Sequence, residues 1–177
     1  LVVWPRGDDD LSEFMRWLTV THTQRWHAHR RSAGTGPVYQ GRFKSFPIEQ
    51  DEHLLTVLRY VERNAVRAKL AKRAEDWRWG SLWRHVYRAT AAAKGDDQPA
   101  LCDWPMARPL NWRRLVNEPL SEAELEAMRV CVNRGRPHGD AAWVSRTVKL
   151  LGLESAMRPR GRPQMPRTEP GMVREDS

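Results

Sequence analysis

One short segment, RYVERNAVRAKL, places a tyrosine and an asparagine four residues apart, at Tyr60 and Asn64. Residues four apart in a helix share a face, so both side chains could contact one ligand. A phenol with a pKa of about 10 is a weak nucleophile at neutral pH, so a reaction at Tyr60 would need a divalent metal to polarise the group that it attacks. An asparagine oxygen is compatible with Mg²⁺ or Mn²⁺. From spacing alone, a half-buried tyrosine on an ordinary helix is the commoner explanation.

The charge of the chain favours a polyanionic partner. Its formal net charge is +8 over 177 residues. Residues 16–88 hold 15 Lys and Arg against 6 Asp and Glu, residues 128–167 hold 9 against 2, and residues 89–127 are net −3. Two basic blocks separated by an acidic one indicate two nucleic-acid contact surfaces. Solvated surface arginine is the ordinary alternative.

Cysteine usage and hydropathy exclude several classes of protein. Cys102 and Cys131 lack the short paired spacings of a zinc site or a disulfide framework, which fits a reducing compartment. The longest apolar stretch, residues 1–4, is far shorter than the roughly 20 residues that span a bilayer. We therefore expect a cytoplasmic protein with no membrane partner. Because the chain begins in the middle of an apolar pattern, we also expect it to be a fragment.

Apolar patterning predicts both strands and helices in the first 90 residues. Residues 1–4 are β-branched and apolar, and residues 38–48 alternate apolar with basic side chains, so both segments read as strands. Asp10 with Glu13 predicts a capping box, and Asp51 predicts the cap of a second helix. The predicted helices span 10–30, 51–69 and 81–90. On the second, an apolar stripe faces the core: Leu54, Leu58, Val61 and Ala65.

The remainder of the chain is expected to be helical and then disordered. Ser121 and Glu124 predict a capping box for a helix that ends near Asn133, and another helix should span 143–151. Two short helices around a glycine-containing turn resemble a helix-turn-helix, although αα-hairpins share the pattern. The predicted units are a first domain (1–90), a linker (91–100), a helical DNA-binding extension (101–153) and a disordered basic tail (154–177).

Several strings, in their order along the chain, resemble the REP-associated tyrosine transposases of bacteria. VYQGRFKS precedes RYVERNAVRAKL, DWRWGSLW follows it, and RGRPHG and LGLES come later. These transposases are relatives of the small insertion-sequence transposases whose single-tyrosine nuclease domain belongs to the HUH superfamily. The resemblance implies an α+β fold: a ferredoxin-like or RNA-recognition-like antiparallel sheet with helices on one face, incomplete at the N-terminus, and a helical C-terminal extension.

The resemblance also implies an activity. Tyr60 would attack a DNA phosphate and leave a 5′ phosphotyrosine and a free 3′ hydroxyl, while Asn64 would help to hold Mg²⁺ or Mn²⁺. The substrates would be single-stranded hairpins formed by repetitive extragenic palindromes, bound by a protein associated with the nucleoid. The sequence leaves monomer and dimer both open. The expected phosphate contacts are Arg42, Lys44, Arg59, Arg63 and Arg67.

In this family a His-x-His strand directly precedes a segment that resembles LVVWP, and its two imidazoles bind the metal. The chain begins at Leu1, so we expect these ligands to be absent and this chain alone to bind DNA without cutting it. His27 and His29 are no substitute, since residues two apart in a helix point roughly 200° apart. His53 shares the Tyr60 face of its predicted helix.

The tail contains RPRGRP, which resembles an AT-hook for A·T-rich duplex DNA. Gly161 would let the backbone lie in a narrow minor groove whose negative potential attracts the flanking arginines. Those arginines are Arg158, Arg160 and Arg162. A chance Arg/Pro/Gly string is the equal alternative. Two other functions stay open for the whole chain: a non-catalytic DNA-binding remnant, and a domesticated regulator that uses residues 121–151 on duplex DNA.

Overall fold

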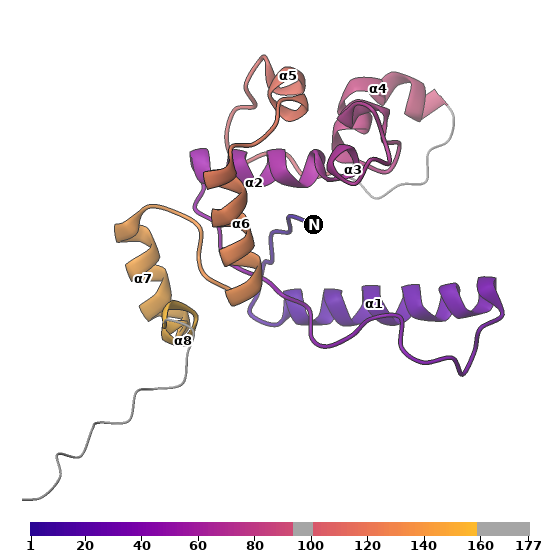
Figure 1. The fold of residues 1–177 in the computed structure, drawn as a ribbon, viewed down its shortest axis with the longest axis horizontal. Helices are drawn as coiled ribbons and strands as arrows, with labels where there is room; N and C mark the ends of the chain where they lie inside the picture. Colours follow the sequence, from indigo (N-terminus) through magenta and orange to yellow (C-terminus); the bar gives the residue numbers. More distant parts are fainter. Residues whose placement is uncertain (94–100, 159–177) are drawn as a thin grey trace, which may run out of the picture.

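The chain forms helices joined by irregular segments (Figure 1). The computed structural model describes residues 1–93 and 101–158. The helices are α1 (Asp10–Arg30), α2 (Glu52–Glu62), α3 (Asn64–Arg67), the 3₁₀ turn η1 (Ala74–Asp76), α4 (Ser81–Ala93), α5 (Trp112–Asn117), α6 (Glu122–Arg134), α7 (Ala141–Leu151) and α8 (Glu154–Met157).

The predicted antiparallel sheet does not form in the described part of the chain, so the expected α+β fold is wrong. A parallel β-bridge joins Ile48, the last residue of the second predicted strand, to His138, and no other residue of the two predicted strands forms a β-bridge. A strand needs a partner along its length for its backbone N–H and C=O groups, and one isolated bridge does not make a sheet. Within residues 38–48, Gly41 has a left-handed φ of 76° and Pro47 lacks an N–H, which interrupts extended pairing.

Helix predictions are confirmed where the capping signals are local. The hydroxyl of Ser121 accepts from the backbone N–H of Glu124 at 3.2 Å, and the Glu124 carboxylate accepts from the Ser121 N–H at 2.6 Å. This capping box starts α6, and Gly135 ends the helix with a φ of 68°. Asp51 starts α2 by accepting from the backbone N–H of His53 at 2.8 Å.

Two helix predictions need correction. The Asp10 carboxylate accepts from the backbone N–H groups of Arg6 and Gly7, both at 2.8 Å, instead of closing the predicted capping box. The predicted helix over 51–69 is divided at Arg63, whose ψ of −7° separates α2 from α3. The turn at Arg63 keeps its N–H bond to the carbonyl of Arg59, so the helical path continues across the division.

The hydrophobic core lies where α2, η1, α4 and α5 meet. Its buried members are Ala74, Leu82, Trp112 and Val116, and its partly buried neighbours are Leu55, Leu58, Val66, Trp104 and Leu115. Leu82 comes from the first predicted domain and Trp112 from the predicted extension, so one core is built from both. Aromatic side chains bury roughly 150–250 Å² each, which makes Trp112 its largest single contributor.

α1 lies outside this core. None of its residues is buried, and the side chains of Trp17 and Trp26 are 62% and 41% exposed. The segment that follows α1 contacts it through Tyr39, whose hydroxyl lies 2.7 Å from Nδ1 of His22. The first helix therefore gains little from tertiary packing.

Glu62 is a carboxylate buried beside the core. Its Oε1 accepts from the hydroxyl of Ser81 at 2.5 Å, and its Oε2 accepts from Nε1 of Trp112 at 2.7 Å. Burial raises the pKa of Glu62 above its ordinary value, opposed by these two hydrogen bonds and by the charge of Arg108. One side chain thus joins α2, α4 and α5.

We predict that Glu62→Gln raises the free energy of unfolding at pH 7. A carboxyl whose pKa is higher in the folded than in the unfolded state loses stability as the pH rises through that interval, whereas glutamine is neutral throughout. Its amide still accepts from Trp112 and donates to Ser81. The difference in free energy of unfolding between the variant and the parent chain, measured with urea, should therefore decrease as the pH is lowered towards about 4.

Glu62→Ala is the matched control for this experiment. It leaves two buried donors without an acceptor and should lower the free energy of unfolding by roughly 1–3 kcal/mol. A difference between Glu62→Gln and the parent chain that does not change with pH would contradict the burial argument.

Candidate functional site

Tyr60 lies half-buried on α2, next to the side chains of α3. The guanidinium carbon of Arg67 lies 4.7 Å from the centre of the Tyr60 ring. Nη2 of Arg67 also donates to Oδ1 of Asn64 at 3.1 Å. The structure therefore brings together a phenol, a carboxamide and an exposed cation that the sequence placed on one helix face.

A pocket of about 160 Å³ adjoins this group. Its lining residues are Tyr60, Arg63, Arg67, Pro119, Leu120 and Leu125. The lining combines two arginines and a tyrosine with apolar side chains from α6 and the segment before it. Such a combination suits an unstacked nucleobase attached to a phosphate.

Arg59, a predicted phosphate contact, is engaged inside the protein. Its Nε donates to the carbonyl of Leu115 at 2.8 Å, and its Nη2 donates to the carbonyls of Glu118 at 3.1 Å and Pro119 at 2.8 Å. Its Nη1 lies 3.4 Å from a carboxylate oxygen of Glu124. Arg59 therefore clamps the end of α5 and the segment after it to α2.

Arg63 makes the same kind of contact one turn further along. Its Nη1 donates to the carbonyls of Val116, at 3.3 Å, and Asn117. Burial, with the nearby charge of Arg59, lowers the pKa of Arg63 below its ordinary value. A DNA contact by either arginine stays a prediction, and it would compete with these backbone carbonyls.

The other predicted DNA contacts are dispersed. Lys44 is exposed, and its Nζ lies 3.4 Å from Oδ1 of Asn133 on α6. Arg42 and Arg158 are exposed. The two remaining arginines of the AT-hook-like string, at positions 160 and 162, lie outside the described residues.

A second buried carboxylate, which the sequence analysis missed, joins η1 to α5. Glu75 is 3% exposed, accepts from Nδ2 of Asn117 at 2.7 Å, and pairs with Arg73 at 3.0 Å and Arg113 at 3.2 Å. Burial acts to raise the pKa of Glu75, but the Asn117 hydrogen bond and the two arginines outweigh it and lower the pKa. Oδ1 of Asn117 also accepts from the backbone N–H of Ala74 at 3.0 Å. Asn117 and Arg113 are distant from Glu75 in the sequence, so no local pattern predicts these two contacts, whereas Arg73 is a near neighbour.

The residues around Tyr60 do not fit the divalent metal that the resemblance implies. The Asn64 oxygen already accepts from the guanidinium of Arg67, and an ion at that oxygen would meet a like charge. The pocket lining offers two arginines and no carboxylate or imidazole. His27 lies on α1, where its Nδ1 is 3.0 Å from the hydroxyl of Ser32.

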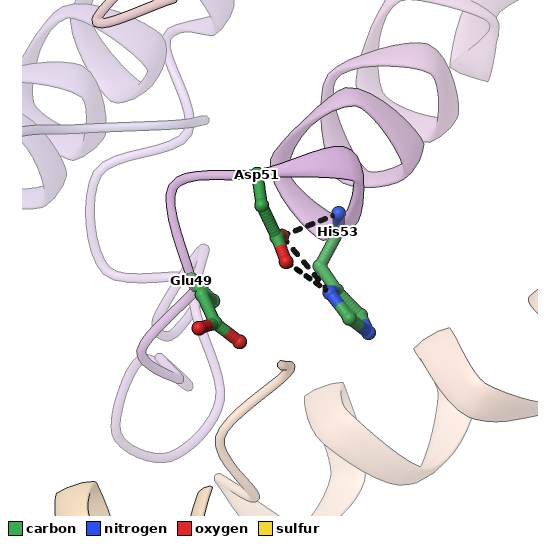
Figure 2. A group of neighbouring side chains, drawn as sticks. All are labelled: Glu49, Asp51 and His53. Atoms are coloured by element: carbon green, nitrogen blue, oxygen red, sulfur yellow. Dashed lines mark hydrogen bonds and ion pairs between the residues drawn. The ribbon is translucent and has the colours of Figure 1, made fainter. Parts of the chain in front are cut away.

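A different group of side chains has metal-ligating chemistry. Glu49, Asp51 and His53 are half-buried and each offers a ligand atom, all within 4.8 Å of one another (Figure 2). Asp51 oxygens lie 2.9 and 3.1 Å from Nδ1 of His53. Burial acts to raise the pKa of Asp51, but its hydrogen bonds with His53 lower it overall. The sequence analysis singled out His53 alone, although alternate positions 49, 51 and 53 carry the signal.

Comparisons of the chain with protein-family models, with curated proteins and with solved structures found no match. The resemblance to tyrosine transposases therefore rests on the sequence strings alone. Among the described helices, none combines the length and the apolar character needed to cross a membrane.

We predict that Arg59→Ala lowers the free energy of unfolding by roughly 2–4 kcal/mol, because three backbone carbonyls lose their donor. Arg67→Ala removes an exposed guanidinium and should cost less than about 1 kcal/mol. Urea unfolding measures both changes. An Arg59→Ala chain that is as stable as the parent but binds DNA less tightly would refute the clamp and make Arg59 a phosphate contact.

Proposed function

We propose that this chain binds single-stranded hairpin DNA and that Tyr60 is the nucleophile of strand cleavage and rejoining, as in the transposases that its sequence resembles. The observation that carries the proposal is that Tyr60 and Arg67 line one pocket and that Arg67 contacts both the Tyr60 ring and the Asn64 oxygen. The proposal also places the chain in the bacterial cytoplasm, with the nucleoid.

The charge beside Tyr60 favours a phosphate. A guanidinium carries five N–H donors in a planar fork, so Arg67 can bind a phosphate and keep its hydrogen bond to Asn64. Arg63 lines the same pocket and adds a second positive charge. A phosphate bound there would lie within reach of a phenol that shares the helix face.

The apolar lining of the pocket favours an unpaired base. Pro119, Leu120 and Leu125 line the pocket together with the charged residues. In a duplex the base faces are covered by stacking, whereas the loop of a hairpin presents them. Single-stranded hairpin DNA can therefore contact both the charged and the apolar lining residues, whereas a regular duplex can contact only the charged ones.

In the proposed reaction the Tyr60 oxygen attacks the phosphorus and forms a new P–O bond. The bond from phosphorus to the 3′ oxygen of the preceding nucleotide breaks, the phenol loses its proton, and the leaving 3′ oxygen takes one up. Arg67 stabilises the charge that develops on the phosphate oxygens. Attack of a 3′ hydroxyl on the phosphotyrosine reverses these steps and rejoins a strand.

A DNA-binding protein without catalysis is the rival function. Its supporting observation is that Arg59 and Arg63, two of the cations nearest to Tyr60 along α2, are engaged by backbone carbonyls. This rival predicts hairpin binding with no covalent product.

In a chain extended with the His-x-His strand that the resemblance implies, we predict that Tyr60→Phe abolishes covalent protein–DNA adducts and leaves hairpin affinity within a few-fold, since only a hydroxyl is lost. The 5′ phosphotyrosine stays on the downstream strand, so a hairpin labelled at its 3′ end reports the adduct after denaturing electrophoresis. Adducts that persist in the variant would remove Tyr60 from this role. Hairpin binding by the extended chain without any adduct would support the non-catalytic rival.

We predict that Arg67→Ala weakens hairpin binding about fivefold or more and reduces the salt dependence by about one unit, as expected for one lost phosphate contact. Arg129→Ala is the matched control, because Arg129 is a surface arginine on α6 paired with Glu122 and Glu126. Equal effects of the two variants would show that the Tyr60 pocket is not the DNA site.

We predict that deletion of residues 158–177 weakens binding to A·T-rich duplex and flattens its salt dependence by about one unit per lost phosphate neutralisation. Hairpin binding should be less affected. An equal loss on G·C-rich duplex would show that the tail is a basic anchor and not a minor-groove reader.

A further inference from the structure

The side chains of Glu49, Asp51 and His53 meet where the irregular segment after α1 enters α2 (Figure 2). We propose that these three residues bind one divalent transition-metal ion of the Zn²⁺ class, with water as a further ligand. The site would be structural and would join the start of α2 to the start of α7.

The spacing of the ligand atoms is close to that of a zinc site. Nδ1 of His53 lies 3.1 Å from Oδ2 of Asp51. Two ligands about 2.0–2.2 Å from a tetrahedral ion lie about 3.3–3.6 Å apart, so an ion can replace the proton between these two atoms with little movement. The farthest atoms of the group are within 4.8 Å, and rotation of the Glu49 carboxylate closes that difference.

The donor set selects the class of ion. Two carboxylates and one imidazole make a mixed oxygen and nitrogen site, which suits Zn²⁺ better than Mg²⁺ or Ca²⁺, whose preferred ligands are all oxygen. Three protein ligands with water in the fourth position complete a tetrahedron.

Glu49 is held in place from the α7 side. Its backbone N–H donates to the carbonyl of His138 at 2.9 Å, and its Oε2 accepts from the backbone N–H of Asp140 at 2.7 Å. A Cβ at Gly139 would lie 2.6 Å from Oε2 and 2.5 Å from the ring of Trp143, so the close approach requires glycine. These contacts hold the Glu49 carboxylate and leave its second oxygen as the proposed metal ligand.

His138 supplies an independent sign of a bound species. Its ring meets the His53 ring edge-on, with 4.9 Å between the centres. Its Nε2 is buried and has no hydrogen-bond partner among the described residues. Buried polar atoms are almost always paired, so an unpaired imidazole nitrogen on a ring that contacts His53 points to a water or an ion at this place. A metal-bound water would satisfy it.

This site is separate from the proposed reaction. His53 and Tyr60 are seven residues apart on α2, a rise of about 10 Å, so one ion cannot contact both side chains. A failure of DNA binding at Tyr60 would leave the metal proposal intact, and a failure of metal binding would leave the DNA proposal intact.

The test uses the full chain with Cys102→Ser, which removes the exposed thiol as an adventitious ligand. After treatment with a chelator, the chain is titrated with Zn²⁺ by isothermal titration calorimetry, and its thermal unfolding is followed with and without the ion. We expect one Zn²⁺ per chain and an increase in Tm of several degrees, because the ion binds only the folded site. Mg²⁺ at the same concentration should leave the Tm unchanged.

Two variants distinguish a metal ligand from a helix cap. Asp51→Asn keeps a good N-cap, so its metal-free Tm should match that of the parent while Zn²⁺ affinity falls at least tenfold. His53→Ala should weaken Zn²⁺ binding as much. His29→Ala, an exposed imidazole on α1, is the matched control and should leave binding unchanged.

Three results would overturn the proposal. The first is no stoichiometric Zn²⁺ binding, and the second is equal affinity in the parent, Asp51→Asn and His53→Ala chains. The third is a thiolate-to-metal charge-transfer band with Co²⁺, which would place the ion on Cys131, whose Sγ lies 3.8 Å from Nδ1 of His138. Hairpin binding measured in parallel reports on the Tyr60 pocket alone.

Discussion

The guanidinium of Arg59 bonds to the backbone at the end of α5, and the meeting of the two halves of the chain depends on this contact. The last carbonyls of a helix lack intrahelical partners and carry the negative end of its dipole. Arg59 and Arg63 satisfy them with positive charge, while Trp112, from the first turn of α5, donates to the buried Glu62. Both ends of a six-residue helix are thus held by α2. With the sheet absent from the described residues, α5 supplies the packing partner that α2 needs.

The structure gives different contacts to arginines that count equally in the net charge of the chain. The first basic block suggested one continuous phosphate-binding surface, but Arg59 and Arg63 are committed to protein carbonyls. Arg67, four residues beyond Arg63, is exposed and stacks on Tyr60. The same clamp brings Pro119 and Leu120 to the Tyr60 pocket. The structural contact therefore also shapes the proposed DNA site, which is why stability and DNA affinity must be measured together for variants on α2.

The chemistry on α2 is divided between its two ends. At its start, Asp51 and His53 join Glu49 in a group that suits a transition metal. Near its other end, Tyr60 is paired with a guanidinium, which supplies the positive charge that the resemblance would assign to a metal. A chelator removes a metal ion that is bound from solution but leaves a guanidinium in place, so experiments can distinguish these two sources of positive charge.

The sequence by itself determined features that depend on neighbours within a few residues: the cap of α2 at Asp51 and the capping box of α6 at Ser121. Capping bonds and helical periodicity are local, so they can be recognised before any tertiary contact is known. The two predicted strands were wrong because a strand is stabilised by pairing with another strand, which local sequence patterns do not identify. Only the tertiary structure decided that Glu62 is buried against Trp112, that Arg59 binds carbonyls more than fifty positions away, and that Glu49 meets the start of α7, because each of these contacts joins groups that are distant along the chain.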